Sequence, residues 1–592
     1  DEIVQLNYNA IDRGANDIVE IEVDPAWANL EVTPLNEPKE TAGCGGCCPT
    51  PSDFVKNIAK PINAIKGNDL PVSAFLGYED GTFENGTSAF EKRGVAVDVP
   101  IWDVDKCIQC NQCSYVCPHA AIRPFLINED ELKASPEPLA TKKPVGKGLD
   151  GLAYRIQVSA LDCVGCGSCA HVCPAPGKAL VMRPIAESLE AHEDVKTDYL
   201  YNNVDYRSDL MPVDTVKGSQ FSKPLFEFHG ACPGCGETPY IKLITQLYGD
   251  RMMVANATGC SSIYSGSAPS TPYTTNKNGE GPSWGSSLFE DNAEYGFGMH
   301  VGVEALRSRI QHTMEENMDK VDEDIATLFK DWIANRQFSV RTREIRDILV
   351  PKLEALNTDF AKEILDLKQY LIKKSQWIIG GDGWAYDIGY GGLDHVLASN
   401  EDINILVVDT EVYSNTGGQA SKSTPTGAVA KFAAAGKPAK KKDLAAIAMS
   451  YGHIYVAQVS MGANQQQALK AIKEAEAHQG PSIIIAYSPC INHGIKKGMS
   501  QAQTEMKLAT ECGYWPIFRY NPSVEKLGKN PLQIDCKEPK WEKYEEYLTG
   551  EVRYQTLTKS NPEEAKILFE TNKRDAQKRW RQYKRMAALD YS

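Results

Sequence analysis

Eight cysteines form two tight groups in the first third of the chain. Each group has the pattern C-x2-C-x2-C-x3-C followed by proline. The groups are Cys107, Cys110, Cys113 and Cys117, and Cys163, Cys166, Cys169 and Cys173. In this pattern three thiolates hold one [4Fe–4S] cube and the fourth ligates the other cube, so the motif occurs in pairs. We therefore expect one cluster on Cys107, Cys110, Cys113 and Cys173, and a second on Cys163, Cys166, Cys169 and Cys117.

Two zinc sites are the alternative for these thiols. Zinc has no need for four cysteines at this spacing followed by proline, so we favour the clusters. Two adjacent iron–sulfur clusters predict electron transfer. Clustered thiols rather than dispersed pairs also predict metal binding in a reducing compartment, which is the cytoplasm or a reducing organelle of an anaerobic eukaryote.

A second set of cysteines lies further along the chain. Cys232 and Cys235 form C-P-G-C, whereas Cys260 and Cys490 each follow a predicted strand. Together they could make a third four-thiolate site. The sequence leaves two alternatives open, a thioredoxin-like pair in C-P-G-C and ordinary buried thiols at the other two positions.

Five further cysteines lack a matching partner spacing. Cys512 and Cys536 are most simply core residues. Cys44, Cys47 and Cys48 lie among glycines, where linker thiols are the favoured interpretation and a further metal site is the alternative.

Two strand ends carry residues suited to a diphosphate and a hard cation. The strand Trp377–Ile379 runs into a G-G-D-G turn with Asp382, and a second strand ends in D-T-E-V-Y-S-N-T-G-G about thirty residues later. Glycine lets backbone approach a diphosphate while a carboxylate reaches the metal. Thr410 and the Val412 carbonyl could complete a magnesium shell. A lone GDG is weak, but the two motifs together predict thiamine diphosphate.

The surrounding pattern predicts elements that position these loops. From about residue 215 short apolar runs alternate with helices, which is typical of buried parallel strands. The runs are Met252–Ala255, Trp377–Ile379, Ile403–Val408, Ile454–Val459 and Ile483–Tyr487. We also expect a helix over Asn464–His478, a helical excursion over 301–375, a loop over 134–149 and a strand within Ile18–Val23. The basic C-terminal helix is interpreted as a solvated face, with an anionic docking site as the alternative.

Composition excludes several classes of protein. The 592 residues predict three to five domains. With 63 Lys and Arg against 78 Asp and Glu, the net charge of −15 argues against nucleic acid as main partner. No apolar run reaches membrane-spanning length. The chain starts at Asp1 without a signal region, which suggests a fragment or a processed subunit.

Seven blocks of this sequence resemble the single-chain, homodimeric pyruvate:ferredoxin (flavodoxin) oxidoreductases. The blocks are the paired ferredoxin-type groups, Phe90–Pro100, Cys232–Glu237, Thr258–Tyr264, Ser287–Met299, Gly381–Val396 and Asp409–Gln419. The resemblance runs along nearly the whole chain. It implies a multidomain α/β protein with a tail of a coenzyme A-contacting domain (1–40), a small EKR linker domain (41–98), an α+β ferredoxin-like domain (99–205) and a thiamine diphosphate-binding α/β domain with a parallel sheet (206–592).

The resemblance also implies cofactors and the residues that hold them. A third [4Fe–4S] cluster would be bound by Cys232, Cys235, Cys260 and Cys490. Magnesium would be bound by Asp382, Thr410 and the Val412 backbone. The residues expected to line thiamine diphosphate are Glu237, Cys260, Gly381, Asp382, Gly383, Trp384, Thr410, Glu411, Val412, Tyr413, Ser414 and Asn415. Asn415 is also expected near the pyruvate carboxylate, as the catalytic residue.

The implied activity is oxidative decarboxylation of pyruvate with coenzyme A to acetyl-CoA and CO2. Electrons would pass through three clusters to ferredoxin or flavodoxin. In this family an N-terminal half supplies the pyrimidine-binding domain, so we expect this chain to require that half as a partner. Two alternatives stay open: another 2-oxoacid as substrate, and a non-catalytic electron carrier. A fused NADP-reducing form is disfavoured because no flavodoxin-like extension follows Ser592.

Overall fold

The computed structural model describes residues 2–20, 22–29, 50–266 and 270–591. It divides into two compact units, residues 1–45 and 46–592. The first unit contains helix α1 (Glu2–Asn16) and a short 3₁₀ turn (Pro25–Asn29). The strand expected within Ile18–Val23 is not formed by the described residues of that stretch. Cys44, Cys47 and Cys48 lie outside the described residues.

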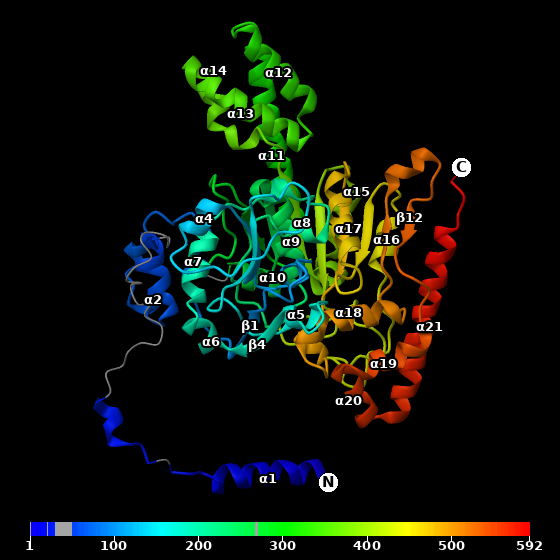
Figure 1. The fold of residues 1–592 in the computed structure, drawn as a ribbon. Helices are drawn as coiled ribbons and strands as arrows, with labels where there is room; N and C mark the ends of the chain where they lie inside the picture. The colour runs from blue at the N-terminus through cyan, green and yellow to red at the C-terminus, as the bar shows by residue number, and fades with distance from the viewer. Residues whose placement is uncertain (1, 21, 30–49, 267–269, 592) are drawn as a thin grey trace. The chain divides into compact units, whose positions relative to one another are not determined.

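An eight-stranded sheet forms the centre of the second unit (Figure 1). In chain order its strands are β5 (Met252–Ala257), β6 (Ser283–Ser287), β7 (Ser375–Gly381), β8 (Asn404–Asp409), β9 (Tyr455–Val459), β10 (Ser482–Tyr487), β11 (Phe518–Tyr520) and β12 (Leu532–Ile534). The spatial order is β12-β11-β9-β10-β8-β7-β5-β6. The six neighbouring strands β9-β10-β8-β7-β5-β6 are all parallel. At the other end of the sheet, β11 pairs antiparallel with both β9 and β12.

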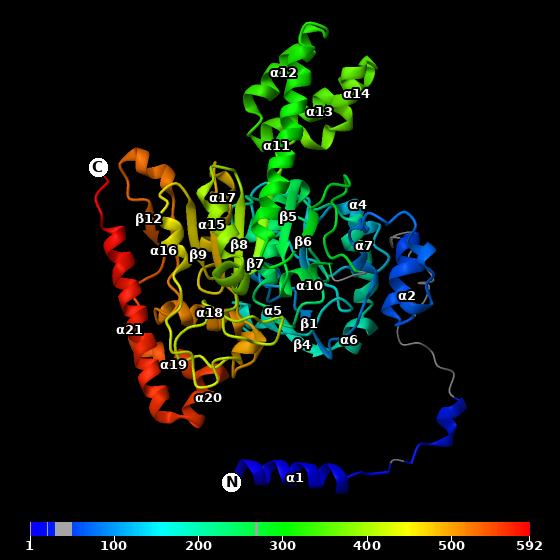
Figure 2. The same ribbon diagram turned by 180° about the vertical axis from the view of Figure 1, so that it is seen from behind.

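The predicted parallel sheet is confirmed, and the five apolar runs coincide with β5, β7, β8, β9 and β10. The central strands β8, β9 and β10 are buried at every position because helices cover the sheet. Figure 2 shows β8, β7, β5 and β6 side by side from behind. Sequence reasoning missed three strands of this sheet: β6 and β12 are the two edge strands, and β11 has only three residues.

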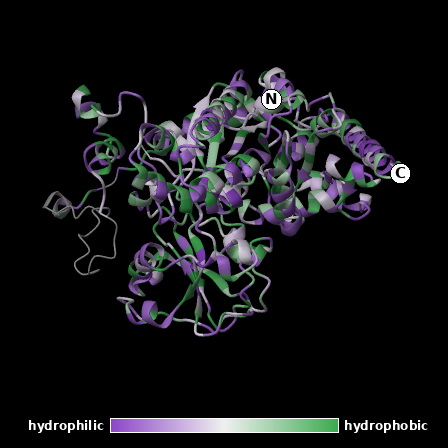
Figure 3. Cartoon of the chain, turned by 90° about the horizontal axis from the view of Figure 1, so that it is seen from above, coloured by the Kyte–Doolittle hydropathy of each residue, from purple (hydrophilic) through white to green (hydrophobic). Residues whose placement is uncertain are grey.

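Helices surround this sheet. They are α9 (Thr238–Tyr248), α10 (Cys260–Gly266), α15 (Tyr390–Ala398), α16 (Leu444–Met449), α17 (Gln465–Ala477), α18 (Ala502–Glu511), α19 (Tyr544–Thr549), α20 (Val552–Ser560) and α21 (Pro562–Ala587). Helix α17 confirms the helix predicted over Asn464–His478, since the Asn464 side chain accepts from the Gln467 N–H as an N-cap. Helix α21 is largely hydrophilic along its length in Figure 3.

The expected helical excursion is four helices, α11 (Asn292–Glu316), α12 (Glu323–Asn335), α13 (Ser339–Leu356) and α14 (Asp359–Asp366). The start of α11 packs on β5 and β7, and α12 to α14 gather at its far end (Figure 1). They enclose a separate apolar core that includes Trp332, whose ring nitrogen donates to the Leu371 carbonyl at 2.8 Å. The arm therefore stabilises itself and leaves the loops at the sheet edge untouched.

The ferredoxin-like part is built from two similar halves. Strand β1 (Asp98–Trp102) pairs antiparallel with β4 (Leu180–Pro184), and β2 (Ile122–Ile127) pairs antiparallel with β3 (Ala153–Val158). Each cysteine group runs into a short helix, α3 (Gln112–Tyr115) or α5 (Ser168–Val172). Residues 134–149 form no helix or strand, as the predicted loop requires.

The connecting helices of this part are α4 (Glu129–Lys133), α6 (Ile185–Glu190), α7 (Glu193–Asn203) and α8 (Val216–Ser219). Residues 50–97 form short helical turns, including α2 (Lys60–Asn63), around a small core with Phe54 and Ile58. All these parts lie in one compact unit, so the domain boundaries stay a prediction. Within the described residues, no helix is both long and apolar enough to span a bilayer.

Candidate functional site

Four adjacent strands bring the predicted site residues to one edge of the sheet. The strands lie in the order β10-β8-β7-β5 and run parallel. Cys490 follows β10, Thr410 follows β8, Asp382 follows β7 and Cys260 follows β5. Carboxyl ends of parallel strands share an edge, where α/β sheets bind ligands. The sheet thus places the oxygen donors between two of the cysteines.

Three oxygen donors converge beyond β7 and β8. The Thr410 hydroxyl lies 3.0 Å from Asp382 Oδ1 and 3.0 Å from the Val412 carbonyl oxygen. A carboxylate, a hydroxyl and a backbone carbonyl are the donor types that magnesium takes. The predicted magnesium ligands are therefore brought together.

The surroundings of Asp382 also suit a cation. Its side chain is buried, and burial followed by the charge of Asp409 raises the pKa of Asp382 well above its usual value. Ser421 donates to its second oxygen at 2.5 Å, which holds the carboxylate in place without neutralising it. A divalent cation at the three oxygens would favour the ionised form, so the residues fit the predicted metal.

One cavity joins these donors to most of the predicted cofactor residues. Its lining includes Glu237, Cys260, Gly381, Asp382, Gly383, Thr410, Val412, Tyr413, Ser414 and Asn415, together with Thr258, Gly259, Ser261, Phe289 and Thr416. Gly383 is required here because a Cβ would lie 2.5 Å from the Tyr413 ring. Three glycines and several hydroxyls beside the Asp382 carboxylate suit a metal-bound diphosphate.

Trp384 and Glu411, which are also predicted to line the cofactor, are not among the residues that line this cavity. Trp384 is fully buried and packs behind the turn, within 3 Å of where a Cβ at Gly380 or Gly389 would lie. Its bulk supports the turn from behind. Glu411 lies between two residues of the loop, but its side chain points to a different cavity.

The Glu411 carboxylate is fully buried in a network of donors. It accepts from Lys441 Nζ at 2.9 Å, Tyr514 Oη at 2.6 Å and Arg553 Nη2 at 2.8 Å. Burial alone would raise the pKa of Glu411, but Lys441 and Arg553 outweigh it and lower the pKa to about 2. Its backbone has φ of +60°, an uncommon conformation for a residue with a side chain. The network therefore anchors the loop between Thr410 and Val412.

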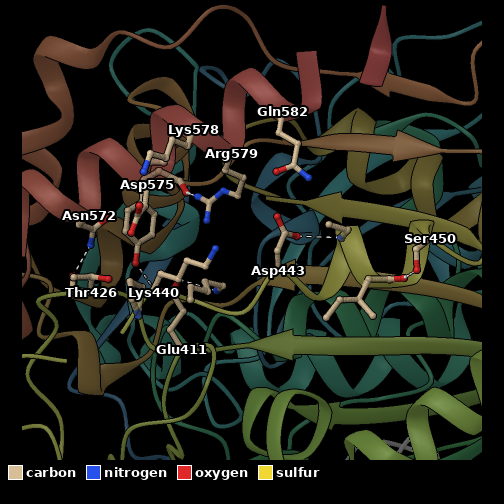
Figure 4. A pocket seen from close by; sticks show the side chains of 16 residues that line it. Glu411, Thr426, Lys440, Asp443, Ser450, Asn572, Asp575, Lys578, Arg579 and Gln582 are labelled. Carbon is tan, nitrogen blue, oxygen red and sulfur yellow. Dashed lines mark hydrogen bonds and ion pairs between the residues drawn. The ribbon is translucent and has the colours of Figure 1, made fainter. Parts of the chain in front are cut away.

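The cavity that Glu411 faces lies between α21 and the segment around α16 (Figure 4). Its walls carry Lys440, Asp443, Lys578 and Arg579 among others. It shares no lining residue with the first cavity, and Glu411 is the one predicted cofactor residue on its wall. The basic C-terminal helix thus contributes to this wall as well as to the solvated surface.

The second cysteine set converges beside the first cavity. Burial, followed by the charges of Glu237 and Cys232, raises the pKa of Cys490 to about 12 against the hydrogen bonds from Asn492. Cys260 has Glu237, Cys490 and Cys232 as charged neighbours, and Cys235 has Glu237 and Cys490. Gly236 touches the Cys490 loop, because its N–H donates to the Pro489 carbonyl at 3.1 Å and a Cβ there would lie 2.5 Å from Pro489. The four thiols of the second set are therefore neighbours of one another in the structure.

The paired groups show the crossed arrangement that the motif predicts. Burial raises the pKa of Cys113 well above its usual value, and three neighbouring thiols raise it further. These neighbours are Cys107, Cys110 and Cys173. The pKa of Cys169 is raised in the same way by burial and by Cys166, Cys117 and Cys163, and by Cys113 of the other set. Each group thus receives its fourth thiol from the other group.

All fourteen cysteines among the described residues are free thiols. No three or more His, Cys, Asp or Glu side chains in the described part of the chain are placed to hold one metal ion. Cys512 and Cys536 belong to the sheet core, as predicted.

Family comparisons assign three segments of this chain. Residues 48–96 match EKR, a domain of unknown function. Residues 106–176 match a 4Fe-4S dicluster domain. Residues 367–486 match the C-terminal TPP binding domain of thiamine pyrophosphate enzymes.

Three relatives align along nearly the whole chain. The pyruvate:ferredoxin oxidoreductase of Moorella thermoacetica is 50% identical over 599 residues, which is 99% of this chain and 49% of the relative. The pyruvate-flavodoxin oxidoreductase of Enterobacter agglomerans is 50% identical over 595 residues, 99% of this chain and 49% of the relative. The chain is a homologue of the pyruvate:ferredoxin and pyruvate-flavodoxin oxidoreductases. The pyruvate dehydrogenase [NADP(+)] of Euglena gracilis is 45% identical and covers 96% of this chain and 31% of the relative.

This chain spans about half the length of the oxidoreductases that it matches, and about a third of the NADP(+) form. The alignment therefore does not separate the fused form from the others. Among solved structures, a 2-oxoglutarate:ferredoxin oxidoreductase from Magnetococcus marinus matches with 16% identity and a TM-score of 0.28, over 45% of this chain and 65% of that one. That similarity is too low to support an inference.

Sequence reasoning did not assign a role to several residues that support the site. Ser421 holds Asp382, and Tyr264 donates to the Glu237 carboxylate at 2.8 Å. Arg553 comes from α20, far from the loop that it anchors. No spacing signal marks such residues, because their partners are distant in the sequence.

We predict that Glu411→Gln lowers the free energy of unfolding by about 3–5 kcal/mol at neutral pH, because Arg553 and Lys441 lose a buried counter-charge. The folded-state pKa of Glu411 is about 2, below its unfolded value of about 4.3. Its contribution is therefore complete above the unfolded value and is lost as pH falls toward 2. Urea titrations from pH 3 to 7 should show the variant losing that part of the acid dependence. The exposed Glu525→Gln is the control; equal effects of the two changes would contradict the network.

Proposed function

We propose that this chain is the cofactor-binding and electron-transfer half of a pyruvate:ferredoxin (flavodoxin) oxidoreductase. The reaction is oxidative decarboxylation of pyruvate with coenzyme A to acetyl-CoA and CO2, with ferredoxin or flavodoxin as acceptor. The names of the aligned relatives support the substrate and the acceptor. The three cysteine sets support three [4Fe–4S] clusters, each with four thiols as neighbours.

One observation carries the proposal: Cys260 belongs both to the third cysteine set and to the lining of the acidic cavity. Its sulfur lies 3.3 Å from the Ser414 hydroxyl, which is 3.5 Å from the Thr410 hydroxyl. A cluster on this set would therefore border the thiamine diphosphate cavity. That arrangement suits an oxidation more than a separate electron carrier.

The residues of the cavity would have different roles. Asp382, Thr410 and the Val412 carbonyl would hold magnesium, and Gly381 and Gly383 leave room for the diphosphate. Bound thiamine diphosphate supplies an electron sink for decarboxylation of a 2-oxoacid. Asn415 is exposed at the cavity mouth, where its amide could donate to the pyruvate carboxylate. Glu237, buried between cavity and third set, is held by Tyr264.

The complete reaction requires the remaining half of the enzyme. The described cavity offers ligands for the metal and space for the diphosphate, and the chain covers half of its relatives. In the proposed assembly, the other half supplies the pyrimidine-binding domain and closes the cavity over the substrate.

We predict about twelve irons and twelve acid-labile sulfides in each anaerobically prepared chain, because three [4Fe–4S] cubes require them. Cys490→Ser should lower the iron count toward eight and leave the ferredoxin-type pair intact. Cys512→Ser, a buried thiol outside all three sets, is the matched control and should keep twelve. Eight irons in the unaltered chain, or no change in the Cys490 variant, would contradict the third cluster.

We further predict that thiamine diphosphate binds to the assembled enzyme only with magnesium. Asp382→Asn should weaken this binding at least tenfold, as loss of a metal-site residue commonly does. Calorimetric titration with and without magnesium measures the effect. The control is Asp402→Asn, which removes a carboxylate paired with Lys373 outside the cavity. Unchanged binding in the Asp382 variant, or equal binding without magnesium, would count against the assignment.

A further inference from the structure

Two segments that carry cysteines of different sets are joined by a pair of stacked histidines. His119 follows Cys117 by two residues, and His229 precedes Cys232 by three. Their rings lie 4.4 Å apart between centroids at an interplanar angle of 30°. Both side chains are buried, with 2% and 1% of their surface exposed. Such burial shows that the two rings form a packed contact between the ferredoxin-like part and the C-P-G-C loop.

Each histidine bonds to the backbone of the opposite segment. His229 Nε2 lies 2.6 Å from the Pro118 carbonyl oxygen, and His119 Nε2 lies 2.9 Å from the Ala231 carbonyl oxygen. Pro118 directly follows Cys117, and Ala231 directly precedes Cys232. The two bonds therefore clamp the residues next to two cluster ligands. We call this pair and its two bonds the histidine clasp.

The hydrogen bonds define the ring state of His229. The Ala231 N–H donates to His229 Nδ1 at 3.2 Å, so Nδ1 is the acceptor. Its Nε2 must then carry the proton and donate to the Pro118 carbonyl. His119 likewise donates from Nε2, since a carbonyl can only accept.

The clasp lies where the third set approaches one ferredoxin-type cluster. Gly234, inside C-P-G-C, lies beside the Cys166 thiol. Gly234 has φ of +76° and a Cβ there would lie 2.7 Å from Met499, so only glycine reaches this position. The C-P-G-C loop thus contacts the ferredoxin-type set that includes Cys117 and Cys166. The histidine clasp joins the same two segments.

The clasp is also connected to the cofactor cavity. The His229 ring stacks on Phe226 at 4.6 Å and lies 5.5 Å from the Tyr264 ring. Tyr264 donates to Glu237, which lines the cavity. Rigid packed neighbours on both sides leave the rings little freedom to move.

We propose that His119 and His229 are positioning residues that fix the gap between the third cluster and the cluster of Cys163, Cys166, Cys169 and Cys117. The clasp holds Cys117 and Cys232 through their neighbouring carbonyls, so the separation of the two clusters and the electron transfer between them depend on it. This rests on the proposed clusters. A variant that keeps both Nε2–H donors should keep the distance between the two clusters. A variant that loses a donor should let the segments of Pro118 and Ala231 move apart.

The test uses the assembled enzyme, prepared anaerobically with His119→Phe, His229→Phe and the matching Gln variants. Phenylalanine keeps a stacked ring without the donor, whereas glutamine returns a donor N–H near the Nε2 position. Two readouts are the magnetic interaction between the reduced clusters in electron paramagnetic resonance and the rate at which the ferredoxin-type pair is reduced by pyruvate. His478→Phe is the control, since it removes a ring-to-carbonyl bond to His453 at the opposite end of the strands.

With iron near twelve, each Phe variant should weaken the magnetic interaction and slow reduction by about tenfold, and each Gln variant should restore both. If a Phe variant loses the third cluster, rescue of the iron by Gln supports the clasp and failure of rescue contradicts it. Unchanged magnetic interaction and rate in both fully loaded Phe variants would overturn the inference. Eight irons in the unaltered enzyme would instead overturn the proposed function.

Discussion

The sheet edge is the constraint on which the site depends. Four parallel neighbours, β10, β8, β7 and β5, end at the same edge, so short loops after them must share a small volume. The inner two strands deliver oxygen donors and the outer two deliver cysteines. The residues proposed for the cation and those proposed for the third cluster therefore lie side by side. Helical insertions such as the α11–α14 arm extend from the body without disturbing that edge (Figure 1).

Buried charge has to be compensated at this edge, and the chain does so in two ways. Glu411 receives a lysine, an arginine and a tyrosine, and its carboxylate remains ionised. Asp382 receives only hydroxyl and backbone donors, so its charge still calls for a cation. The two acids follow neighbouring strands, Asp382 after β7 and Glu411 after β8, but their surroundings differ. The network around Glu411 stabilises its loop, whereas Asp382 is the residue proposed to bind the cation.

The sequence predicted the elements and the ligand sets because their signals are local. Apolar runs gave the five central strands, and the cysteine spacing gave the crossed sets that the structure brings together. The loop motif likewise placed Asp382 and Thr410 correctly beside Val412. Side-chain direction was beyond such signals, so Glu411 and Trp384 were expected to line the cofactor. The loop passes the cavity, but backbone conformation and packing turn those two side chains away from it.

Residues that act across the fold could not be predicted either. His229, Ser421 and Arg553 find their partners through contacts between segments more than thirty residues apart, which neither periodicity nor spacing records. These contacts fix where the loops lie relative to one another. They therefore decide whether three thiolate sets form a continuous route or three isolated sites.

The most direct measurement of the central claim is anomalous diffraction at the iron edge from anaerobic crystals of the assembled enzyme. The account predicts three separate four-iron peaks, one of them enclosed by Cys232, Cys235, Cys260 and Cys490 and bordering the cavity of Asp382 and Thr410. Iron at the two ferredoxin-type sets alone, with nothing among those four sulfurs, would contradict it.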